Sequence, residues 1–229
     1  MTAIAIDDQQ RKAARIVGFT YLLAMVVAVF AESYARAHVV IPGNPLETAS
    51  NIAANETLFR SGIAANILVS VIDTVLITSL YVVLRPINRN LAALAVFFRV
   101  IETAVLTVTS ANDFGAIRIV AGTRDLSALS VLTAAHGIGF TVAFIFLGLG
   151  STLFAYLWWQ ARYVPRVLAG LGIVGSALMA AVSLAFLVDP GLLKVLFPVY
   201  MGPIGIFEIS MGLWLLFKGL PRAQRPESP

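Results

Sequence analysis

The amino-acid sequence predicts an all-α integral membrane protein, a six-transmembrane-helix bundle with a short interfacial helix between the first and second spans. Three observations lead to this fold class. The chain is 59% hydrophobic and 12% charged, whereas soluble domains average roughly 45–50% apolar and about 25% charged residues. Apolar segments of about 20 residues, the length that crosses a bilayer as a helix, recur along the chain. Basic residues gather at the ends of these segments, as they do at membrane–water boundaries.

Six apolar segments are predicted to cross the bilayer, at residues 14–31, 61–84, 90–113, 127–160, 167–188 and 196–217. The first resembles a signal peptide, but its apolar middle is long for one and five further spans follow, so we expect it to remain as a span. The fourth must tilt, kink or project beyond the lipid, because a helix rises about 1.5 Å per residue. Residues 1–13 and 220–229 are interpreted as cytoplasmic tails around one membrane domain at 14–219.

A short helix is also predicted within residues 33–59, the longest connection between spans. Asn44, Pro45 and Glu47 form a typical helix start, with a capping side chain, then proline, then an acidic residue in the first turn. Apolar residues then recur at helical spacing, namely Leu46, Ala49, Ile52, Ala53 and Phe59. We expect this helix to lie at the membrane surface, and both a lid over the bundle and an inert re-entry helix fit the pattern.

The distribution of basic residues predicts the orientation. Alternating the connections between the two sides of the membrane places ten basic residues on one side and five on the other, with Arg99 inside a span. Cytoplasmic loops carry the excess of Lys and Arg, so we expect both termini in the cytoplasm. The larger set is Arg11, Lys12, Arg15, Arg85, Arg89, Arg162, Arg166, Lys218, Arg222 and Arg225, and the smaller set is Arg36, Arg60, Arg118, Arg124 and Lys194.

Five ionisable residues lie inside apolar segments and form the candidate site: Asp73, Arg99, Glu102, His136 and Glu208. A charged side chain in the middle of a bilayer costs roughly 2.5–3.5 kcal/mol on insertion scales. Such residues persist when they have a partner or a task, and these five come from four different spans. We therefore expect them to face one another.

The five side chains together predict an acid/base set. Arg99 is expected to hold one carboxylate, either Glu102 on the same helix or Asp73 on the preceding span. An apolar setting favours the neutral form of a carboxyl group that lacks a cationic partner, and His136 is able to share a proton with it. A neutral acid, an arginine-bound carboxylate and an imidazole can donate and accept protons.

A structural role is the alternative for each group. Arg99 and one acid would form a buried ion pair that sets helix register, and His136 would be a core histidine with satisfied hydrogen bonds. Glu208 lies between two glycines, which would let another helix approach and cap it with a backbone group. Glu32 and Asp113 lie near span ends, where water reaches them, and are expected to be ordinary boundary residues.

Composition and motifs exclude several classes of site. The chain has no cysteine, which excludes disulfides, Cys-ligated zinc, iron–sulfur clusters and cysteine nucleophiles. The sequence has no Glu-x-x-His pair, P-loop, dinucleotide fingerprint, Gly-x-Ser-x-Gly or HExxH motif, and an arginine among the candidate ligands disfavours a dicationic metal. We therefore predict no metal and no cofactor. The net charge of +4 reflects the span ends and gives no support for nucleic-acid binding.

Several short pieces of the sequence resemble a known family. In chain order they are residues 55–60 (NETLFR), Asp73, 84–89 (LRPINR), 97–102 (FFRVIE), His136 followed by Gly139 and Phe140, 148–156 (GLGSTLFAY), 163–166 (YVPR), 205–208 (GIFE) and 214–219 (WLLFKG). With this order over residues 14–219, the chain resembles the bacterial membrane family catalogued as domain of unknown function 4386. The resemblance implies a bacterial multi-helix protein of the inner (plasma) membrane, and it carries no activity.

The predicted function is an intramembrane acid/base enzyme that acts on a lipid-soluble, isoprenoid-like small molecule. Glu208 or Asp73 would donate the proton, Arg99 and Glu102 would organise the site, and His136 would act as a relay. Two alternatives stay open: a structural or partner-binding membrane protein, and a small proton-coupled carrier for an amphipathic solute. Small size and the lack of an inverted repeat disfavour the carrier. The lipid bilayer is the expected partner, and the oligomeric state stays open.

Overall fold

The computed structural model describes residues 6–221, except for the side chains of residues 193 and 194, and every element in that part of the chain is a helix. Within it, six helical segments are long and apolar enough to cross a membrane: Asp8–Arg36, Glu56–Leu84, Arg89–Ala121, Leu126–Ala161, Arg166–Val188 and Val199–Phe217. A short helix, α2 (Pro45–Ala54), lies between the first two. The all-α, six-span prediction with an additional short helix is therefore confirmed.

The first and last spans are each composite. The first is α1 (Asp8–Val29) followed without a break by the π-helical η1 (Phe30–Arg36), and the last is the 3-10 turn η2 (Val199–Met201) followed by α8 (Gly202–Phe217). Helix α1 begins before residue 14 because Asp7 and Gln10 form a reciprocal capping box. The predicted tails fall partly outside the described residues, at 1–5 and 222–229.

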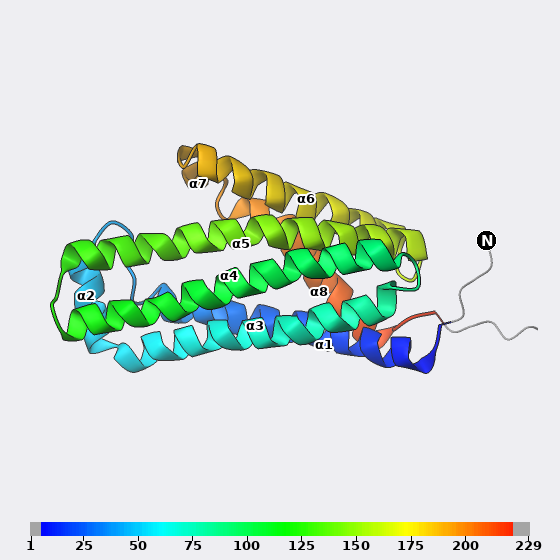
Figure 1. The fold of residues 1–229 in the computed structure, drawn as a ribbon, viewed down its shortest axis with the longest axis horizontal. Helices are drawn as coiled ribbons and strands as arrows, with labels where there is room; N and C mark the ends of the chain where they lie inside the picture. The colour runs from blue at the N-terminus through cyan, green and yellow to red at the C-terminus, as the bar shows by residue number, and fades with distance from the viewer. Residues whose placement is uncertain (1–5, 222–229) are drawn as a thin grey trace, which may run out of the picture.

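The four central spans are α3 (Glu56–Leu84), α4 (Arg89–Ala121), α5 (Leu126–Ala161) and α6 (Arg166–Val188), and α7 (Gly191–Leu196) leads into the last span. In Figure 1 the N-terminal end of α1, the α3–α4 turn and the α5–α6 turn lie at one end of the molecule. Helix α2 and the α4–α5 connection lie at the other end, which we call the α2 end. The figure also shows α8 crossing the bundle diagonally, from α7 to the N-terminal part of α1.

Helices α4 and α5 project past α6 at the α2 end. With 36 and 23 residues, α5 and α6 are about 54 Å and about 35 Å long at a rise of about 1.5 Å per residue. Gly148 of α5 faces Ser176 and Ala180 of α6. Because the two helices are antiparallel, the C-terminal end of α6 lies beside the part of α5 that is close to His136. At the α2 end, α5 therefore extends beyond the end of α6.

The projecting end has a hydrophobic core of its own. Val39, Ile52, Phe59, Ile117 and Leu129 are among its buried members, and α2 packs across α3, α4 and α5 there. This core explains why helix α4 continues through residues 114–121, beyond the predicted end of the third span at residue 113. Apolar residues in that stretch are buried under α2. The free energy gained by burying them favours the helix although the polar residues of the stretch remain exposed.

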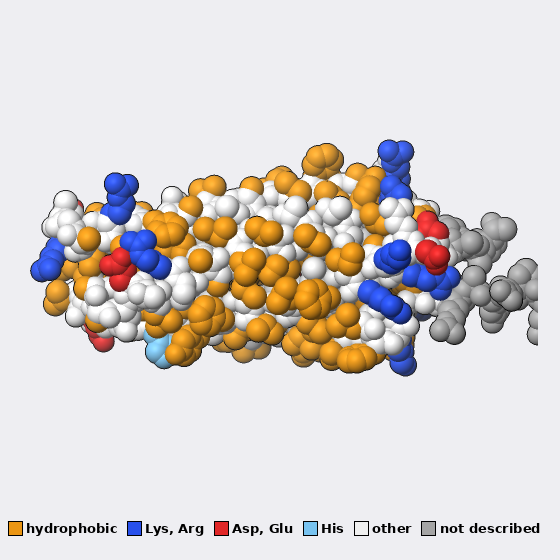
Figure 2. All heavy atoms as spheres, turned by 90° about the horizontal axis from the view of Figure 1, so that it is seen from below, with side chains coloured by type: hydrophobic (Ala, Val, Ile, Leu, Met, Phe, Trp, Pro, Cys, Tyr) orange, Lys and Arg blue, Asp and Glu red, His pale blue; other side chains and the backbone are white. Residues whose placement is uncertain are grey.

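A second, larger core fills the opposite end, where parts of α1, α3, α4, α5, α6 and α8 meet around Trp158, Phe154 and Phe207. The surface between the two ends is hydrophobic, and Lys and Arg side chains gather toward the ends (Figure 2). An apolar surface between two charged ends is the pattern that a bilayer requires, with its hydrocarbon core between two membrane–water boundaries. The chain is therefore an integral membrane protein.

Helices α1 and α8 touch closely at one point and diverge from it. A Cβ atom added at Gly18 would lie 2.8 Å from the Gly212 carbonyl oxygen, and one added at Gly212 would lie 2.9 Å from the Leu22 side chain. Toward its N-terminus, α8 leaves α1 and packs on α6, where Gly175 contacts Ile204 and Gly172 contacts the Phe207 ring. A wedge therefore opens between the second half of α1 and the first half of α8.

Candidate functional site

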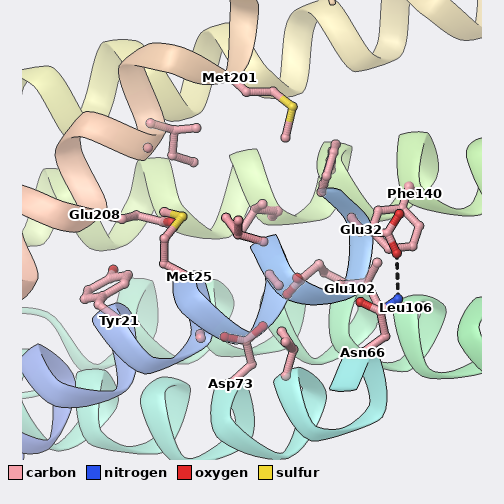
Figure 3. A pocket seen from close by; sticks show the side chains of 18 of the residues that line it. Tyr21, Met25, Glu32, Asn66, Asp73, Glu102, Leu106, Phe140, Met201 and Glu208 are labelled. Atoms are coloured by element: carbon pink, nitrogen blue, oxygen red, sulfur yellow. Dashed lines mark hydrogen bonds between the residues drawn. The ribbon is translucent and has the colours of Figure 1, made fainter. Parts of the chain in front are cut away.

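The wedge contains a cavity of about 310 Å³, which lies between the two hydrophobic cores (Figure 3). Its volume is at the lower limit of small-molecule sites. Most of its wall is apolar, with three methionines and two phenylalanines among the lining side chains. Its polar lining consists of Tyr21, Glu32, Ser33, Asn66, Asp73, Arg99, Glu102, Ser110 and Glu208. Four of the five candidate residues therefore lie on one cavity.

Arg99 joins two of the acids. Its Nη2 atom lies 3.4 Å from Oδ1 of Asp73 on α3, and its Nε atom lies 3.4 Å from Oε2 of Glu102, one turn further along α4. The Nη1 atom donates a hydrogen bond of 3.3 Å to the Ser151 hydroxyl on α5. All three charged side chains are buried, with residue exposures of 3% for Arg99, 6% for Asp73 and 1% for Glu102. Glu102 and Asp73, which were predicted as alternative partners of Arg99, are thus both in contact with it.

Glu208 approaches the same cavity from α8 (Figure 3). Within the described residues its carboxyl group makes no side-chain hydrogen bond and no ion pair. The nearby Gly205 also lines the cavity, and a Cβ atom there would meet nothing within 4 Å. Gly212 instead packs against α1 at the crossing with Gly18. The glycines around Glu208 therefore do not bring in a backbone group that caps it.

The cavity is elongated along α4. Arg99 and Ser110 both line it and are eleven residues apart, which corresponds to about 16 Å of helix. Ser110 is fully buried, and its hydroxyl has no hydrogen-bond partner within residues 6–221. Near it, the Asn66 amide donates a hydrogen bond of 2.6 Å to Glu32. The cavity thus has an acidic end around Glu208 and a second polar end around Ser110.

His136 does not join the other four candidates, contrary to the expectation that all five would face one another. It lies on α5 one to three turns before Phe140, Phe144 and Leu147, the residues through which that helix reaches the cavity. Its ring stacks on Phe140, with centroids 4.5 Å apart. The convergence of only four groups follows from the α4–α5 register, which pairs His136 with Asp113 and places Arg99 next to Gly150.

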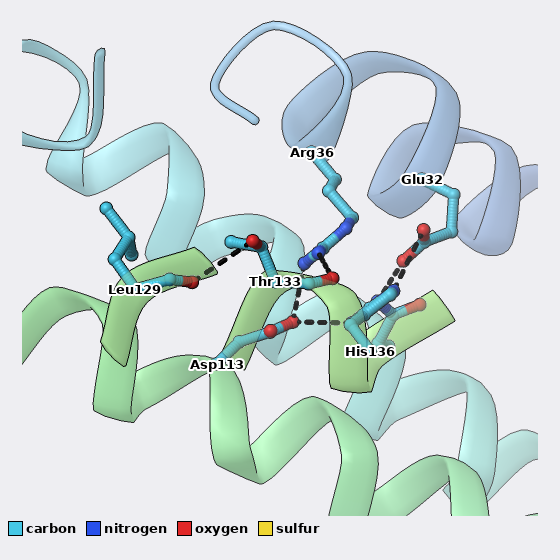
Figure 4. A network of polar contacts seen from close by, with 7 residues as sticks. Glu32, Arg36, Asp113, Leu129, Thr133 and His136 are labelled. Atoms are coloured by element: carbon cyan, nitrogen blue, oxygen red, sulfur yellow. Dashed lines mark hydrogen bonds and ion pairs between the residues drawn. The ribbon is translucent and has the colours of Figure 1, made fainter. Parts of the chain in front are cut away.

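His136 instead belongs to a second network at the α2 end (Figure 4). Its Nδ1 atom lies 2.8 Å from Oδ2 of Asp113, and its Nε2 atom lies 3.2 Å from Oε2 of Glu32. Arg36 donates a hydrogen bond of 2.9 Å from Nη1 to the same Asp113 oxygen. Because Glu32 also lines the cavity, the row Glu32–His136–Asp113 leads from the cavity toward the projecting end of the bundle.

Sequence reasoning missed the functional potential of Glu32 and Asp113, which were expected to be ordinary boundary residues. Asp113 is only 4% exposed and bonds to two cationic or ionisable groups. One signal was available, because Asp113 falls on the same helical stripe as Arg99 and Glu102. The spacing of Glu32 and Arg36 predicts a pair with each other, but each contacts a residue from another helix.

The two networks differ in charge balance. At the α2 end, two carboxylates, Glu32 and Asp113, face Arg36 and the ionisable His136. At the acidic end of the cavity, three carboxyl groups share a single arginine. Across the described residues, no three His, Cys, Asp or Glu side chains are grouped closely enough to hold a metal ion. The acidic end therefore has more carboxyl groups than cations, and within the described residues Glu208 makes no ion pair.

Comparisons with known proteins identify a relative and a family for this chain. An archaeal protein from Archaeoglobus fulgidus, described as "Uncharacterized protein", is 26% identical over 166 residues, which are 71% of this chain and 86% of that protein. No solved structure matches the chain. The family described as "Domain of unknown function (DUF4386)" matches residues 16–219, which include both networks and the whole cavity. The chain therefore belongs to the DUF4386 family.

Proposed function

We propose that this protein is an intramembrane acid/base enzyme that acts on a lipid-soluble, isoprenoid-like small molecule. One observation carries the proposal: a mostly apolar cavity between membrane-spanning helices is lined by four carboxyl groups and one arginine, and three of these carboxyl groups lie at its acidic end with the arginine. Helix pairing alone accounts for the ion pairs of Arg99, but it needs neither a cavity nor an acid without a partner. A cavity with apolar walls and a few placed polar groups is the usual form of a small-molecule site.

Each polar side chain of the cavity has a distinct role in this proposal. Glu208 exchanges a proton with the substrate, because no ion pair or hydrogen bond within the described chain holds its carboxyl group. Arg99 and Glu102 form the fixed part that orients the substrate, and Asp73 on the opposite wall is the second proton donor. His136 acts as a relay through Glu32, which contacts it and lines the cavity.

The substrate enters from the membrane through the wedge between α1 and α8. The cavity rim includes Val29 and Ser33, which are exposed, and Met201 and Gly205, which are half-buried. These positions belong to two spans that diverge at the depth of the apolar belt. A lipid-soluble molecule can therefore reach the acids without crossing water.

The proposal includes an orientation in the inner (plasma) membrane, with both termini in the cytoplasm. It rests on the excess of basic residues at the end that holds the N-terminal part of α1 and the α3–α4 and α5–α6 turns. In this orientation α2, the projecting end and the network around His136 face the opposite side of the membrane.

The test is a search for turnover in a mixture of candidate substrates. The purified protein in lipid nanodiscs is incubated with a total lipid extract of its source organism, and products are followed by liquid chromatography with mass spectrometry. We expect one or a few lipid-soluble species to change with the wild-type protein, and Glu208→Gln to reduce this change by about 10²–10⁴-fold, the usual contribution of a general acid or base. Glu56→Gln is the matched control, because Glu56 does not line the cavity and pairs with the exposed Arg60.

Two outcomes would reject the enzyme. Either no species depends on the wild-type protein, or the change persists in both Glu208→Gln and Asp73→Asn. Thermal unfolding of each variant shows whether it is folded. A protein that is needed only for helix pairing, or for binding a partner, would lose stability in these variants without any substrate change.

A proton-coupled carrier is the second candidate, favoured by the row Glu32–His136–Asp113 that leads from the cavity to the projecting end. A carrier moves protons across liposomes when its solute is present, whereas an enzyme does not. Proton flux that depends on a solute and is lost in His136→Asn would select the carrier.

A further inference from the structure

We infer that the ligand of this cavity is a cationic amphiphile, an elongated apolar molecule with an amine or ammonium group that binds beside Glu208. This inference names the substrate class of the proposed enzyme and rests on that proposal. It follows from the charge, the shape and the unsatisfied polar groups of the cavity.

Charge is the first argument. Asp73, Glu102 and Glu208 line the acidic end together with a single cation, Arg99. Arg99 forms ion pairs with both Asp73 and Glu102, so its single positive charge is already outnumbered by the two carboxyl groups beside it. A carboxylate group without a partner in an apolar wall gains most from a cation that arrives with the ligand. Glu208 holds the cation when it is deprotonated, and Asp73 remains as the second proton donor.

The spacing of the acids favours an organic cation over a metal ion. In the part of the chain that the structure describes, no three acidic or imidazole side chains are close enough to coordinate one ion. The acids approach from α3, α4 and α8 and are spread over the wall of the cavity. An ammonium group has several donors and binds such separated acceptors, whereas a metal needs ligands that converge on one point.

The second polar end supplies an independent observation. Ser110 is 0% exposed, lines the cavity and has no hydrogen-bond partner for its hydroxyl within residues 6–221. A buried hydroxyl without a partner is costly, so a polar group of a ligand that reaches Ser110 would gain a hydrogen bond there. It lies about 16 Å along α4 from Arg99, which defines the length of the molecule.

The wall between the two polar ends fits an apolar body. It is formed by Met25, Leu106, Phe140, Phe144 and other apolar side chains. Methionine adapts to irregular apolar surfaces. The opening toward lipid through the wedge suits an amphiphile, because its body stays in the apolar belt while its charged group reaches the acids.

The test compares three probes with the same alkyl chain: dodecylamine, dodecanol and dodecanoate. Saturable binding of each labelled probe is measured with the wild-type protein in phosphatidylcholine nanodiscs, and empty nanodiscs correct for partition into lipid. We expect dodecylamine to bind more tightly than the other two by about tenfold or more, the effect of one charge-assisted hydrogen bond. Glu208→Gln should remove this preference and leave dodecanol binding unchanged, whereas Glu56→Gln should change neither.

A matched pair of glycine variants locates the binding. Gly205 lines the cavity and Gly137 does not, and a Cβ atom added at either would meet nothing within 4 Å. Gly205→Leu should therefore weaken binding of every probe that enters the cavity, and Gly137→Leu should have no effect. Asp73→Asn provides a second test of charge in case Glu208→Gln does not fold.

The outcomes separate this inference from the proposed function. If the three probes bind equally and neither Glu208→Gln nor Asp73→Asn changes the affinities, the cationic class is wrong, while a lipid-soluble ligand of the cavity still stands. If no probe shows saturable binding, or if Gly205→Leu has no effect on any of them, the cavity is not a ligand site and both proposals fail.

Discussion

Arg99 on α4 and Asp73 on α3 face each other in the membrane-spanning part of the bundle, with the arginine Nη2 atom 3.4 Å from the aspartate Oδ1 atom. The same guanidinium contacts Glu102 through Nε, also at 3.4 Å. This arginine therefore connects two helices at the wall of the cavity and leaves Glu208 without a cation of its own.

The Arg99–Asp73 contact predicts a large loss of stability when the arginine is removed. Arg99→Met should reduce the free energy of unfolding by about 3–5 kcal/mol, because it leaves two buried carboxylates uncompensated. The triple variant Arg99→Met/Asp73→Asn/Glu102→Gln should regain much of this loss. Unfolding by sodium dodecyl sulfate in mixed micelles measures both. Arg60→Met is the control, since its pair with Glu56 is shorter, 2.7 Å, but about half exposed, and should cost about 0–1 kcal/mol. Equal losses at positions 60 and 99 would contradict the buried role of Arg99.

Arg36 is predicted to hold η1 against α4 and α5. It contacts Asp113 at 2.9 Å and the Thr133 carbonyl oxygen at 3.5 Å, and its side chain is only 13% exposed. Arg36→Ala should therefore lower the local opening free energy of η1 amides by about 1.5–3 kcal/mol, the range for hydrogen bonds to charged groups. Hydrogen exchange followed by mass spectrometry gives this value for each segment. Arg118→Ala removes an exposed arginine from the same end of the molecule and should leave η1 unchanged. Protection of η1 that survives Arg36→Ala would show that packing alone holds it.

The crossing of α1 and α8 predicts opposite effects of the same substitution at two glycines. Gly18→Ala should destabilise the protein by about 1–3 kcal/mol, since the added Cβ would lie under 3.0 Å from backbone atoms of α8, which cannot rotate away. Gly137→Ala meets open space within α5 and should be neutral or stabilising by about 0.5–1 kcal/mol. Thermal unfolding in detergent measures both variants. If Gly18→Ala had no effect on stability, α1 and α8 would be further apart at Gly18 than the structure shows. The wedge would then not begin at a close contact of these two helices.

The proposed orientation predicts which positions a membrane-impermeant thiol reagent can label in intact cells. The natural chain has no cysteine, so single-cysteine variants report one position each. Ser127→Cys, at the exposed start of α5 near α2, should react, and Arg85→Cys, in the exposed α3–α4 turn, should react only after the cells are opened. The reverse pattern would place both termini outside the cytoplasm.

Local sequence signals predicted the elements well. The run Asn44, Pro45 and Glu47 predicted the start of α2, and the Asn44 side chain accepts a hydrogen bond from the Glu47 amide. Small residues recur at four-residue spacing on α6, as Gly172, Ser176 and Ala180, and the structure packs this face against Phe207 and Gly148. These features follow from helix periodicity and capping, which depend on residues within one or two turns.

The candidate site was predicted only in part, and the reason is helix register. Periodicity shows that Asp73, Arg99, Glu102 and Glu208 point inward, but it contains no information about how far one helix is shifted along another. That shift is set by close contacts such as Gly139 with Thr109 and Gly148 with Ala180. The resulting α4–α5 register brings His136 to Asp113, so it separates the histidine from the four residues on the cavity.

By itself the sequence determined the number of spans, the short helix α2 and the list of charged groups that lipid would not tolerate, because hydrophobicity and helical period are properties of each segment alone. The tertiary structure decided which of those groups share a cavity, that Glu32 and Asp113 are part of a network, and that α1 and α8 diverge to open a wedge. These outcomes depend on where small residues let two backbones approach, and such a contact is a property of two helices together. Helix packing therefore decides which charged side chains surround Glu208 and His136.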